Sequence, residues 1–317
     1  MPRLVERDKD IPRRAFLAAG SAWLACAVLS GAGQDGSPRT RLVLLGTAGG
    51  PTPKGKSSAP AQAIVVGDRI YLVDAGDGVA RQLALAKLPF RQLRAVFITH
   101  HHSDHNAGYG PLFLLGWTAG LSTPVDAYAP PPVIEMTRKL LEAYRYDIEL
   151  RIADEGRPPL APLIRPHEIT EAGEIFKDDR VRVTAALNDH PPIRHSFAYR
   201  FDTADRSIAI SGDTRYSEAV VKLARGADVL VHEVVSREYW ERPGAPQPPG
   251  VVRHILASHT DAPDVGRVAA AAGVGTLVLS HYVPTEGPGT PADEEWIAGV
   301  RRHFKGKIVI GRDLMEV

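Results

Sequence analysis

Four histidines and one aspartate stand within six consecutive residues, directly after a segment with the composition of a buried strand. The segment is residues 93–99, whose centre Val96-Phe97-Ile98 is apolar and rich in strand-forming residues. The cluster that follows, residues 100–105, reads HHHSDH. Imidazole and carboxylate groups together are the ligand set of a zinc-like divalent ion. This strand and its loop constrain the fold more than any other feature of the chain.

The spacing inside the cluster predicts two metal positions. His100 and His102 can point the same way from an extended turn and hold one ion, whereas Asp104 and His105 project differently and can hold a second. The alternative is a solvated polar loop, or a histidine cluster without function. The order and spacing of the residues, and the candidate partner ligands further along the chain, favour the metal site.

The N-terminal segment resembles an export signal. Residues 12–17, PRRAFL, place two arginines before an apolar run over residues 15–29, and small residues follow at 30–32. This pattern resembles the twin-arginine signal of bacteria. We therefore expect a Tat-type signal peptide at residues 1–32, the twin-arginine export machinery as a partner, and a periplasmic or secreted mature chain without stable membrane association. A short membrane anchor or a helix of the fold is the alternative, although 15 apolar residues are few for a membrane span.

The single cysteine, Cys26, lies within that segment. An intramolecular disulfide is therefore impossible, and so is a thiolate-rich metal site. The 317-residue chain has a formal net charge of +1. This near-neutral balance argues against a polyanion binder that is held by bulk electrostatics.

Three further segments with strand character each end in a potential metal ligand. Residues 180–186 precede His190, residues 206–210 precede Asp213, and residues 276–280 precede His281. A rigid sheet delivers loop residues to one of its edges with little conformational freedom. Together with the strand before His100, these endings predict one shared site.

This order of residues resembles the metallo-β-lactamase superfamily over about residues 41–312. The motif from His100 to His105, the later ligands, Gly46-Thr47, Asp74 and the Ser-Gly-Asp-Thr motif at residues 211–214 carry the resemblance. It implies an α/β fold, an αββα sandwich of two similar halves with the metals at one edge, and a hydrolase domain over residues 33–317. Residues 45–47 (LGT), 232–233 (HE) and 258–260 (SHT) resemble the ribonuclease Z and arylsulfatase-like branch.

The resemblance also implies a ligand for each position of a dinuclear metal site. One ion, expected to be Zn²⁺ like the other, would take His100, His102 and His190. The second would take Asp104, His105 and His281, and Asp213 would bridge the two. Two ions about 3.5–4 Å apart bind a shared hydroxide and lower its pKa toward neutrality. That hydroxide would attack an ester, with Asp104 also orienting it.

Three residues beside the predicted ligands are expected to act without binding metal. The position of His259 in the ribonuclease-like branch implies either assistance to the leaving group or structural packing. Glu233 is expected to hold His259 by a hydrogen bond, which is a common way to orient a residue of a metal site. Asp74 is expected to orient a loop or a ligand rather than to bind metal.

The expected substrate is a small ester, either an aryl sulfate or a phosphodiester. Ribonuclease Z needs an RNA-holding arm between the third histidine and the bridging aspartate, and here residues 191–212 give only 22 positions there. The near-zero net charge also argues against a polynucleotide, so no nucleic acid is expected as a partner. Tyr239 and Trp240 would form either an apolar wall for an aryl group or an ordinary half-buried aromatic pair.

Two other hypotheses stay open. A β-lactamase or lactonase would share the metal site and differ only in its pocket. A metal-binding protein without turnover, such as a scavenger or sensor, belongs to a different class. The complete ligand set, with Asp104 and an open bridging position, favours hydrolysis over the second hypothesis.

Overall fold

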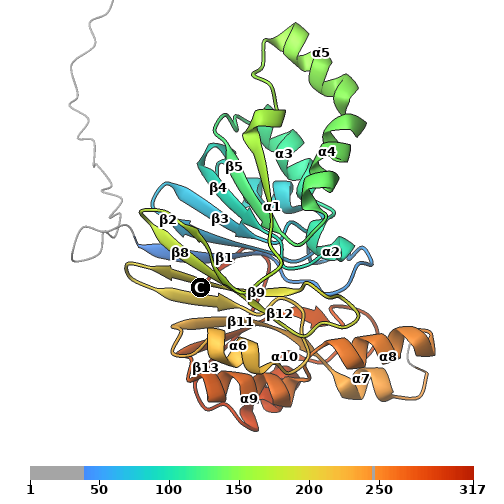
Figure 1. The fold of residues 1–317 in the computed structure, drawn as a ribbon. Coiled ribbons are helices and arrows are strands. Elements are labelled where there is room, and N and C mark those ends of the chain that lie inside the picture. Colours follow the sequence, from blue (N-terminus) through green and yellow to red (C-terminus); the bar gives the residue numbers. More distant parts are fainter. Residues whose placement is uncertain (1–38, 245–246) are drawn as a thin grey trace, which may run out of the picture.

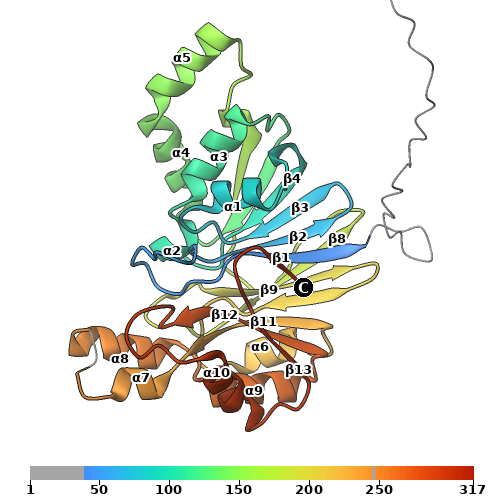
Figure 2. The ribbon, with the colours of Figure 1, turned by 180° about the vertical axis from the view of Figure 1, so that it is seen from behind.

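The computed structural model describes residues 39–244 and 247–317 of the 317-residue chain. Two seven-stranded sheets pack face to face, and helices cover the outer face of each sheet (Figures 1 and 2). The expected signal peptide at residues 1–32 lies outside the described residues, so the signal and the export that depends on it stay predictions. Within the described ranges, no helix is both long enough and apolar enough to cross a membrane.

The first sheet holds the N-terminal half of the chain and has the strand order β14-β1-β2-β3-β4-β5-β6. Strands β1 to β3 pair antiparallel and β3 to β6 pair parallel. The strands are β1 (Thr40–Gly46), β2 (Ala61–Val66), β3 (Arg69–Val73), β4 (Leu93–Phe97), β5 (Val125–Ala129), β6 (Ile164–Glu168) and β14 (Met315–Glu316). The connecting helices are α1 (Val79–Leu85), η1 (Phe90–Gln92), α2 (Ser103–Asn106), α3 (Tyr109–Thr118), α4 (Val133–Ala143), α5 (Arg145–Glu155) and η2 (Ala161–Leu163).

The second sheet repeats this plan with the order β13-β12-β11-β10-β9-β8-β7. Strands β7 to β10 pair antiparallel and β10 to β13 pair parallel. The strands are β7 (Gly173–Lys177), β8 (Val181–Leu187), β9 (Phe197–Thr203), β10 (Ser207–Ile210), β11 (Val229–Val235), β12 (Thr276–Val283) and β13 (Lys307–Ile310). The helices are α6 (Glu218–Leu223), α7 (Arg237–Glu241), α8 (Pro249–Ser258), α9 (Ala262–Ala272) and α10 (Asp293–Arg301).

Three main apolar clusters bind these four layers together. Along β4 the side chains alternate, so that Val96 packs toward the helices of the first half while Ala95 and Phe97 pack between the two sheets. A third cluster joins the second sheet to α6, α9 and α10, with Val268 and Trp296 among its buried residues. The αββα sandwich that the sequence predicts is therefore confirmed. Both sheets direct the ends of their parallel strands toward the same edge.

Two helical segments lie outside the sandwich. After β5 the chain forms two helices, α4 and α5, which meet at Tyr144 and project from the body (Figure 1). After α7, a segment rich in proline leads to α8, which begins at Pro249. A proline favours the first turn of a helix, where its missing N–H costs no hydrogen bond. The prolines of this segment therefore mark the start of a helix as well as a loop.

The packing between the sheets predicts a large stability effect at Phe97. Its ring is fully buried and lies 5.3 Å from the Phe201 ring and 5.7 Å from the Tyr199 ring, centroid to centroid. Phe97→Ala should lower the free energy of unfolding by about 3–5 kcal/mol, measured by urea denaturation. Tyr146→Ala, at a position that is 81% exposed, should change it by less than about 0.5 kcal/mol. Equal effects of the two changes would contradict the packing described.

Candidate metal centre

The ligand loop of the first half is an extended segment that turns into a short helix. After β4 the chain stays extended as far as His102, whose backbone (φ −85°, ψ 150°) caps α2. His100 and His102 therefore project from extended backbone, whereas Asp104 and His105 project from the first helical turn. His100, Asp104 and His105 are buried and His102 is half-buried. The change of backbone conformation sends the two pairs in different directions, as the spacing predicts.

The second half delivers three further ligands from three strands. His190 follows β8, Asp213 follows β10, and His281 lies within β12. The pairing of β11 with β12 matches Glu233 to Ser280 and Val234 to Tyr282, so His281 is skipped and forms a bulge with φ +47°. A bulge redirects a side chain, and positive φ in a residue other than glycine concentrates at functional sites.

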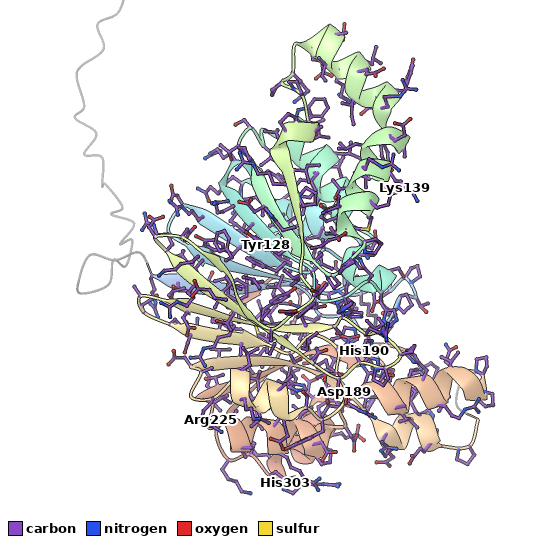
Figure 3. All side chains as sticks on the ribbon, in the orientation of Figure 1. Tyr128, Lys139, Asp189, His190, Arg225 and His303 are labelled. Atoms are coloured by element: carbon purple, nitrogen blue, oxygen red, sulfur yellow. The ribbon has the colours of Figure 1, made fainter. Side chains whose placement is uncertain are left out.

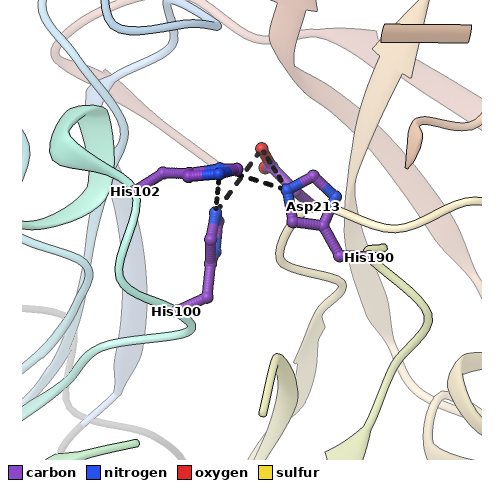
Figure 4. A group of neighbouring side chains, drawn as sticks. All are labelled: His100, His102, His190 and Asp213. Atoms are coloured by element: carbon purple, nitrogen blue, oxygen red, sulfur yellow. Dashed lines mark hydrogen bonds and ion pairs between the residues drawn. The ribbon is translucent and has the colours of Figure 1, made fainter. Parts of the chain in front are cut away.

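A first group of side chains brings His100, His102, His190 and Asp213 together (Figure 4). Their ligand atoms all lie within 4.8 Å of one another. His102 Nδ1 lies 3.0 Å from His100 Nε2 and 3.2 Å from His190 Nε2. Asp213 Oδ2 lies 4.0 Å from the Nε2 atoms of both His100 and His190.

A second group joins Asp104, His105 and His281 to the same Asp213. His105 Nε2 lies 3.3 Å from His281 Nε2 and 3.2 Å from Asp213 Oδ1. His281 Nε2 lies 3.2 Å from Asp213 Oδ2 and 3.4 Å from Asp104 Oδ2. All four side chains are buried. Asp213 is thus shared by the two groups, so the structure assembles every residue that the sequence predicts as a metal ligand.

The outward nitrogens of three rings are already hydrogen-bonded. His190 Nδ1 donates to the Ser258 carbonyl oxygen at 2.9 Å. His105 Nδ1 donates to Asp74 Oδ2 at 2.8 Å, and His100 Nδ1 lies 3.0 Å from Thr99 Oγ1. A neutral imidazole that donates from one nitrogen carries a lone pair on the other. The inward Nε2 atoms of His100 and His190, whose pKa values burial lowers, therefore aim lone pairs into a shared space. Burial opposes a charge on His105 as well, but Asp213, Asp74 and Asp104 raise its pKa, so its inward nitrogen holds a proton when no cation lies there.

This arrangement fits a pair of divalent ions. Lone pairs that face one another at about 3 Å repel unless a cation lies among them. Asp213 Oδ1 is buried and makes no hydrogen bond within the described part of the chain, which leaves it free for a metal. Imidazole and carboxylate suit zinc and similar ions, and the outward hydrogen bonds fix each ring as metal sites require. The donor set is consistent with a dinuclear site, and Zn²⁺ stays a prediction.

The charges of the two aspartates are stabilised by their histidine neighbours. Burial opposes ionisation of Asp213, but the adjacent His105 and His281 hold its pKa well below the usual range. Burial likewise opposes ionisation of Asp104, and the same two histidines lower its pKa. Burial lowers the pKa of His190 to about 4, which keeps this ring neutral and able to bind a metal. Both carboxylates are therefore ionised at neutral pH.

Asp74 connects the end of β3 to the ligand loop. Its carboxylate accepts hydrogen bonds from the Thr99 N–H at 2.8 Å, the Thr99 hydroxyl at 3.0 Å and His105 Nδ1 at 2.8 Å. It is buried and has a φ of +60°. Asp74 thus orients both the loop and one ligand ring.

His259 and Glu233 lie beside the bridging aspartate. Glu233 Oε1 accepts from the N–H groups of Thr214 at 3.1 Å and Thr260 at 3.0 Å, and lies 3.3 Å from His259 Nδ1. The last contact is an ion pair without the geometry of a good hydrogen bond. Burial alone would lower the pKa of His259, but the Glu233 carboxylate and then Asp213 raise it to about 9. His259 is therefore a cation at neutral pH.

A cavity of about 1060 Å³ opens over both ligand groups. One wall is the glycine-rich loop over residues 49–56, and the other includes Val251, His254 and Ile255 of α8. Gly49 lets this loop pass close to the site, because a Cβ there would lie 2.9 Å from His281 Nδ1. Figure 3 shows His190 near the level where the two halves meet, with His303 at the far end of the second half.

His254 and Lys54 also line this cavity, and no local pattern in the sequence predicts either of them there. His254 Nδ1 lies 3.3 Å from Ser258 Oγ, one helical turn further along α8. The prolines at the start of this helix favour a loop, so the sequence does not predict the helix. Lys54 lies in the glycine-rich loop over residues 49–56. Tyr239 and Trp240 are buried as an ordinary aromatic pair whose surface lines the cavity.

Comparisons with known proteins agree with this geometry. Residues 69–282 match the model of the beta-lactamase superfamily domain. A ribonuclease Z from Mycobacterium bovis is 34% identical over 279 residues, which cover 87% of this chain and 97% of that protein. The metallo-beta-lactamase fold protein YhfI from Bacillus subtilis aligns with a TM-score of 0.67 at 21% identity, covering 88% of this chain and 98% of YhfI. The short form of human tRNase Z aligns with a TM-score of 0.63 at 20% identity, covering 87% and 98%.

These relatives correct one expectation from the sequence. The absence of a nucleic-acid partner was expected because residues 191–212 leave no room for an arm and because the net charge is near zero. The prediction is wrong, since ribonucleases and tRNases act on nucleic acid and the alignment spans 97% of one ribonuclease Z. Net charge is a sum over the whole surface, and it does not report the local charge at a cavity. The resemblance to the superfamily and to ribonuclease Z is confirmed.

The hydrogen bonds of Asp74 predict that Asp74→Asn weakens metal binding. Asparagine keeps the shape and tolerates positive φ, but its amide is a poorer acceptor for His105 Nδ1. Zn²⁺ affinity, measured by competition with a chelator, should fall about 10–100-fold. Asp68→Asn, in the exposed turn between β2 and β3, should leave it unchanged. An unchanged affinity in Asp74→Asn would show that this carboxylate does not support the ligands.

Proposed function

The chain belongs to the metallo-β-lactamase superfamily and is a metal-dependent hydrolase with a His/Asp metal site, and we propose that it hydrolyses phosphodiester bonds in RNA. The sharing of Asp213 by two ligand groups on the floor of one cavity is the observation that carries this proposal. Two ions held there would polarise a phosphoryl group and lower the pKa of a water molecule. The names of the ribonuclease Z relatives favour RNA over other esters.

Asp104 is proposed to orient the attacking water. Its carboxylate lines the cavity and lies 3.4 Å from His281 Nε2 and 3.6 Å from His105 Nε2. These two rings hold Asp104 in the ionised state, in which it accepts a hydrogen bond. A water that donates to this carboxylate has its lone pairs directed away from the protein and toward a phosphorus atom in the cavity.

His259 is proposed to donate a proton to the leaving oxygen. Nδ1 faces Glu233, so Nε2–H is left for the cavity that His259 lines. The neighbouring carboxylates keep His259 protonated, as a general acid requires. Glu233 is fixed in turn by the backbone N–H groups of Thr214 and Thr260. A poor leaving group such as a ribose alkoxide gains most from this proton.

The substrate is tested by supplying the metal-loaded protein with candidate esters. The panel contains an RNA oligonucleotide, bis-(p-nitrophenyl) phosphate, an aryl sulfate, a lactone and a cephalosporin. We expect cleavage of the RNA and of the phosphodiester, with kcat/KM higher for RNA. Selective cleavage of the sulfate, lactone or cephalosporin would contradict the proposal and assign the chain another ester. Full metal loading without any turnover would instead support the metal-binding protein without catalysis.

The role of His259 predicts a dependence on the leaving group. His259→Asn should lower kcat for RNA about 10²–10⁴-fold, because the alkoxide then leaves without a proton. The loss should be below about tenfold for bis-(p-nitrophenyl) phosphate, since nitrophenolate is a good leaving group. Metal content should stay unchanged.

The matched control is His303→Asn, at an exposed histidine far from the site (Figure 3). It should leave both rates unchanged. Equal losses for the two substrates in His259→Asn would show that His259 acts through packing and donates no proton.

A further inference from the structure

The two walls of the cavity differ in charge. Among the described residues that line it, the side chains with an ammonium or guanidinium group are Lys54 and Lys56, and both belong to the glycine-rich loop. The opposite wall presents Val251 and Ile255 of α8. An anionic group of a substrate is therefore attracted to the loop, whereas an apolar ring is accommodated against α8.

Lys54 is placed to bind such an anionic group. Its side chain is half-buried, and Nζ donates to the carbonyl oxygens of Gly50 at 3.4 Å and Thr52 at 2.5 Å. An ammonium has three donors, so one remains for a ligand. No carboxylate of the described residues lies within 4.0 Å of Nζ. Burial lowers the pKa of Lys54, and Asp104 and Glu286 partly offset this. Lys54 lines the same cavity as Asp104 and Asp213.

The loop that carries Lys54 is held at several points. Asp313 accepts from the N–H groups of Thr47 at 3.0 Å and Ser58 at 2.6 Å, one on each side of the loop. Near its middle, Glu286 Oε1 accepts from Gly55 N–H at 2.9 Å. These bonds fix the backbone before any ligand binds, so the ammonium is positioned in advance.

The cavity is much larger than one phosphodiester group. A volume of about 1060 Å³ is at the upper end of the range of pockets that enclose a drug-sized ligand. A scissile phosphate held at the metal site would occupy only the floor of the cavity, above Asp213. The remaining space borders the loop on one side and α8 on the other.

We propose that Lys54 binds the phosphate that neighbours the scissile phosphate in an RNA strand, and so selects a polynucleotide over an isolated diester. The proposal rests on the phosphodiesterase function and names a residue that determines its specificity. A charge-assisted hydrogen bond from an ammonium to a phosphate oxygen supplies the attraction. The nucleoside that joins the two phosphates then presents its base to the apolar wall of α8.

The test compares ligands that carry one or two phosphates. Dissociation constants of the metal-loaded protein are measured by calorimetry for adenosine 3′,5′-bisphosphate, adenosine 3′-monophosphate and adenosine 5′-monophosphate. The wild-type protein should bind the bisphosphate about tenfold more tightly than either monophosphate, as a charge-assisted bond to a second phosphate implies. Lys54→Met should reduce this preference to below about threefold, and Lys54→Arg should keep most of it.

Lys139→Met is the matched control, because it removes the same charge from an exposed position of α4 that does not line the cavity. Its preference should stay within about twofold of the wild-type value, since water screens an exposed charge. Lys54→Gln is a second variant, and thermal unfolding with metal analysis verifies that each variant folds and loads.

An unchanged preference in both Lys54→Met and Lys54→Gln would overturn the proposal, and so would equal losses in Lys54→Met and Lys139→Met. The experiments distinguish failure of the phosphate subsite from failure of the phosphodiesterase function. Cleavage of RNA with no role for Lys54 in bisphosphate binding would remove the phosphate subsite and leave the phosphodiesterase function. A bisphosphate preference that depends on Lys54, without cleavage of any phosphodiester, would support the subsite and remove the catalytic function.

Discussion

The mutual repulsion of buried lone pairs is the constraint on which the rest of this structure depends. Five imidazoles and two carboxylates from the two halves of the chain face one another, and six of these seven groups are buried, with His102 half-buried. Bringing such groups out of water is unfavourable unless cations lie among them. The four-layer sandwich supplies the rigid support, because each ligand follows a strand whose register is fixed by both neighbours or lies within one.

The support extends outward from the ligands in a second set of contacts. Asp74 holds the ligand loop and the ring of His105, and the Ser258 carbonyl holds the ring of His190. Both Asp74 and His281 have positive φ, a conformation that only a well-determined surrounding structure maintains. Ser258 also ends α8, the helix that forms the apolar wall of the cavity. The same elements therefore position the metal ligands and line the cavity for the substrate.

The sequence predicts which side chains the fold brings together, because their signal is local. His100, His190 and Asp213 each follow a recognisable strand, His281 lies near the end of another, and strand ends meet at one edge of a sheet. The bulge at His281 was not predictable, because a bulge is a property of how β11 pairs with β12. Lys54 was not predictable either, since its position depends on bonds to distant residues such as Asp313 and Glu286. The expectation that no nucleic acid is a partner was wrong because net charge is a sum over the whole surface and does not report the charge at the cavity.

The number of metal ions that the protein binds tests the central claim most directly. Metal-depleted protein is titrated with Zn²⁺ while bound metal is counted per chain. The account predicts two tightly bound equivalents in the wild-type protein, and the loss of one of them in His190→Ala, because His190 belongs to one ligand group alone. A single equivalent in the wild-type protein, or two equivalents that both survive in His190→Ala, would contradict a centre built from two groups that share Asp213.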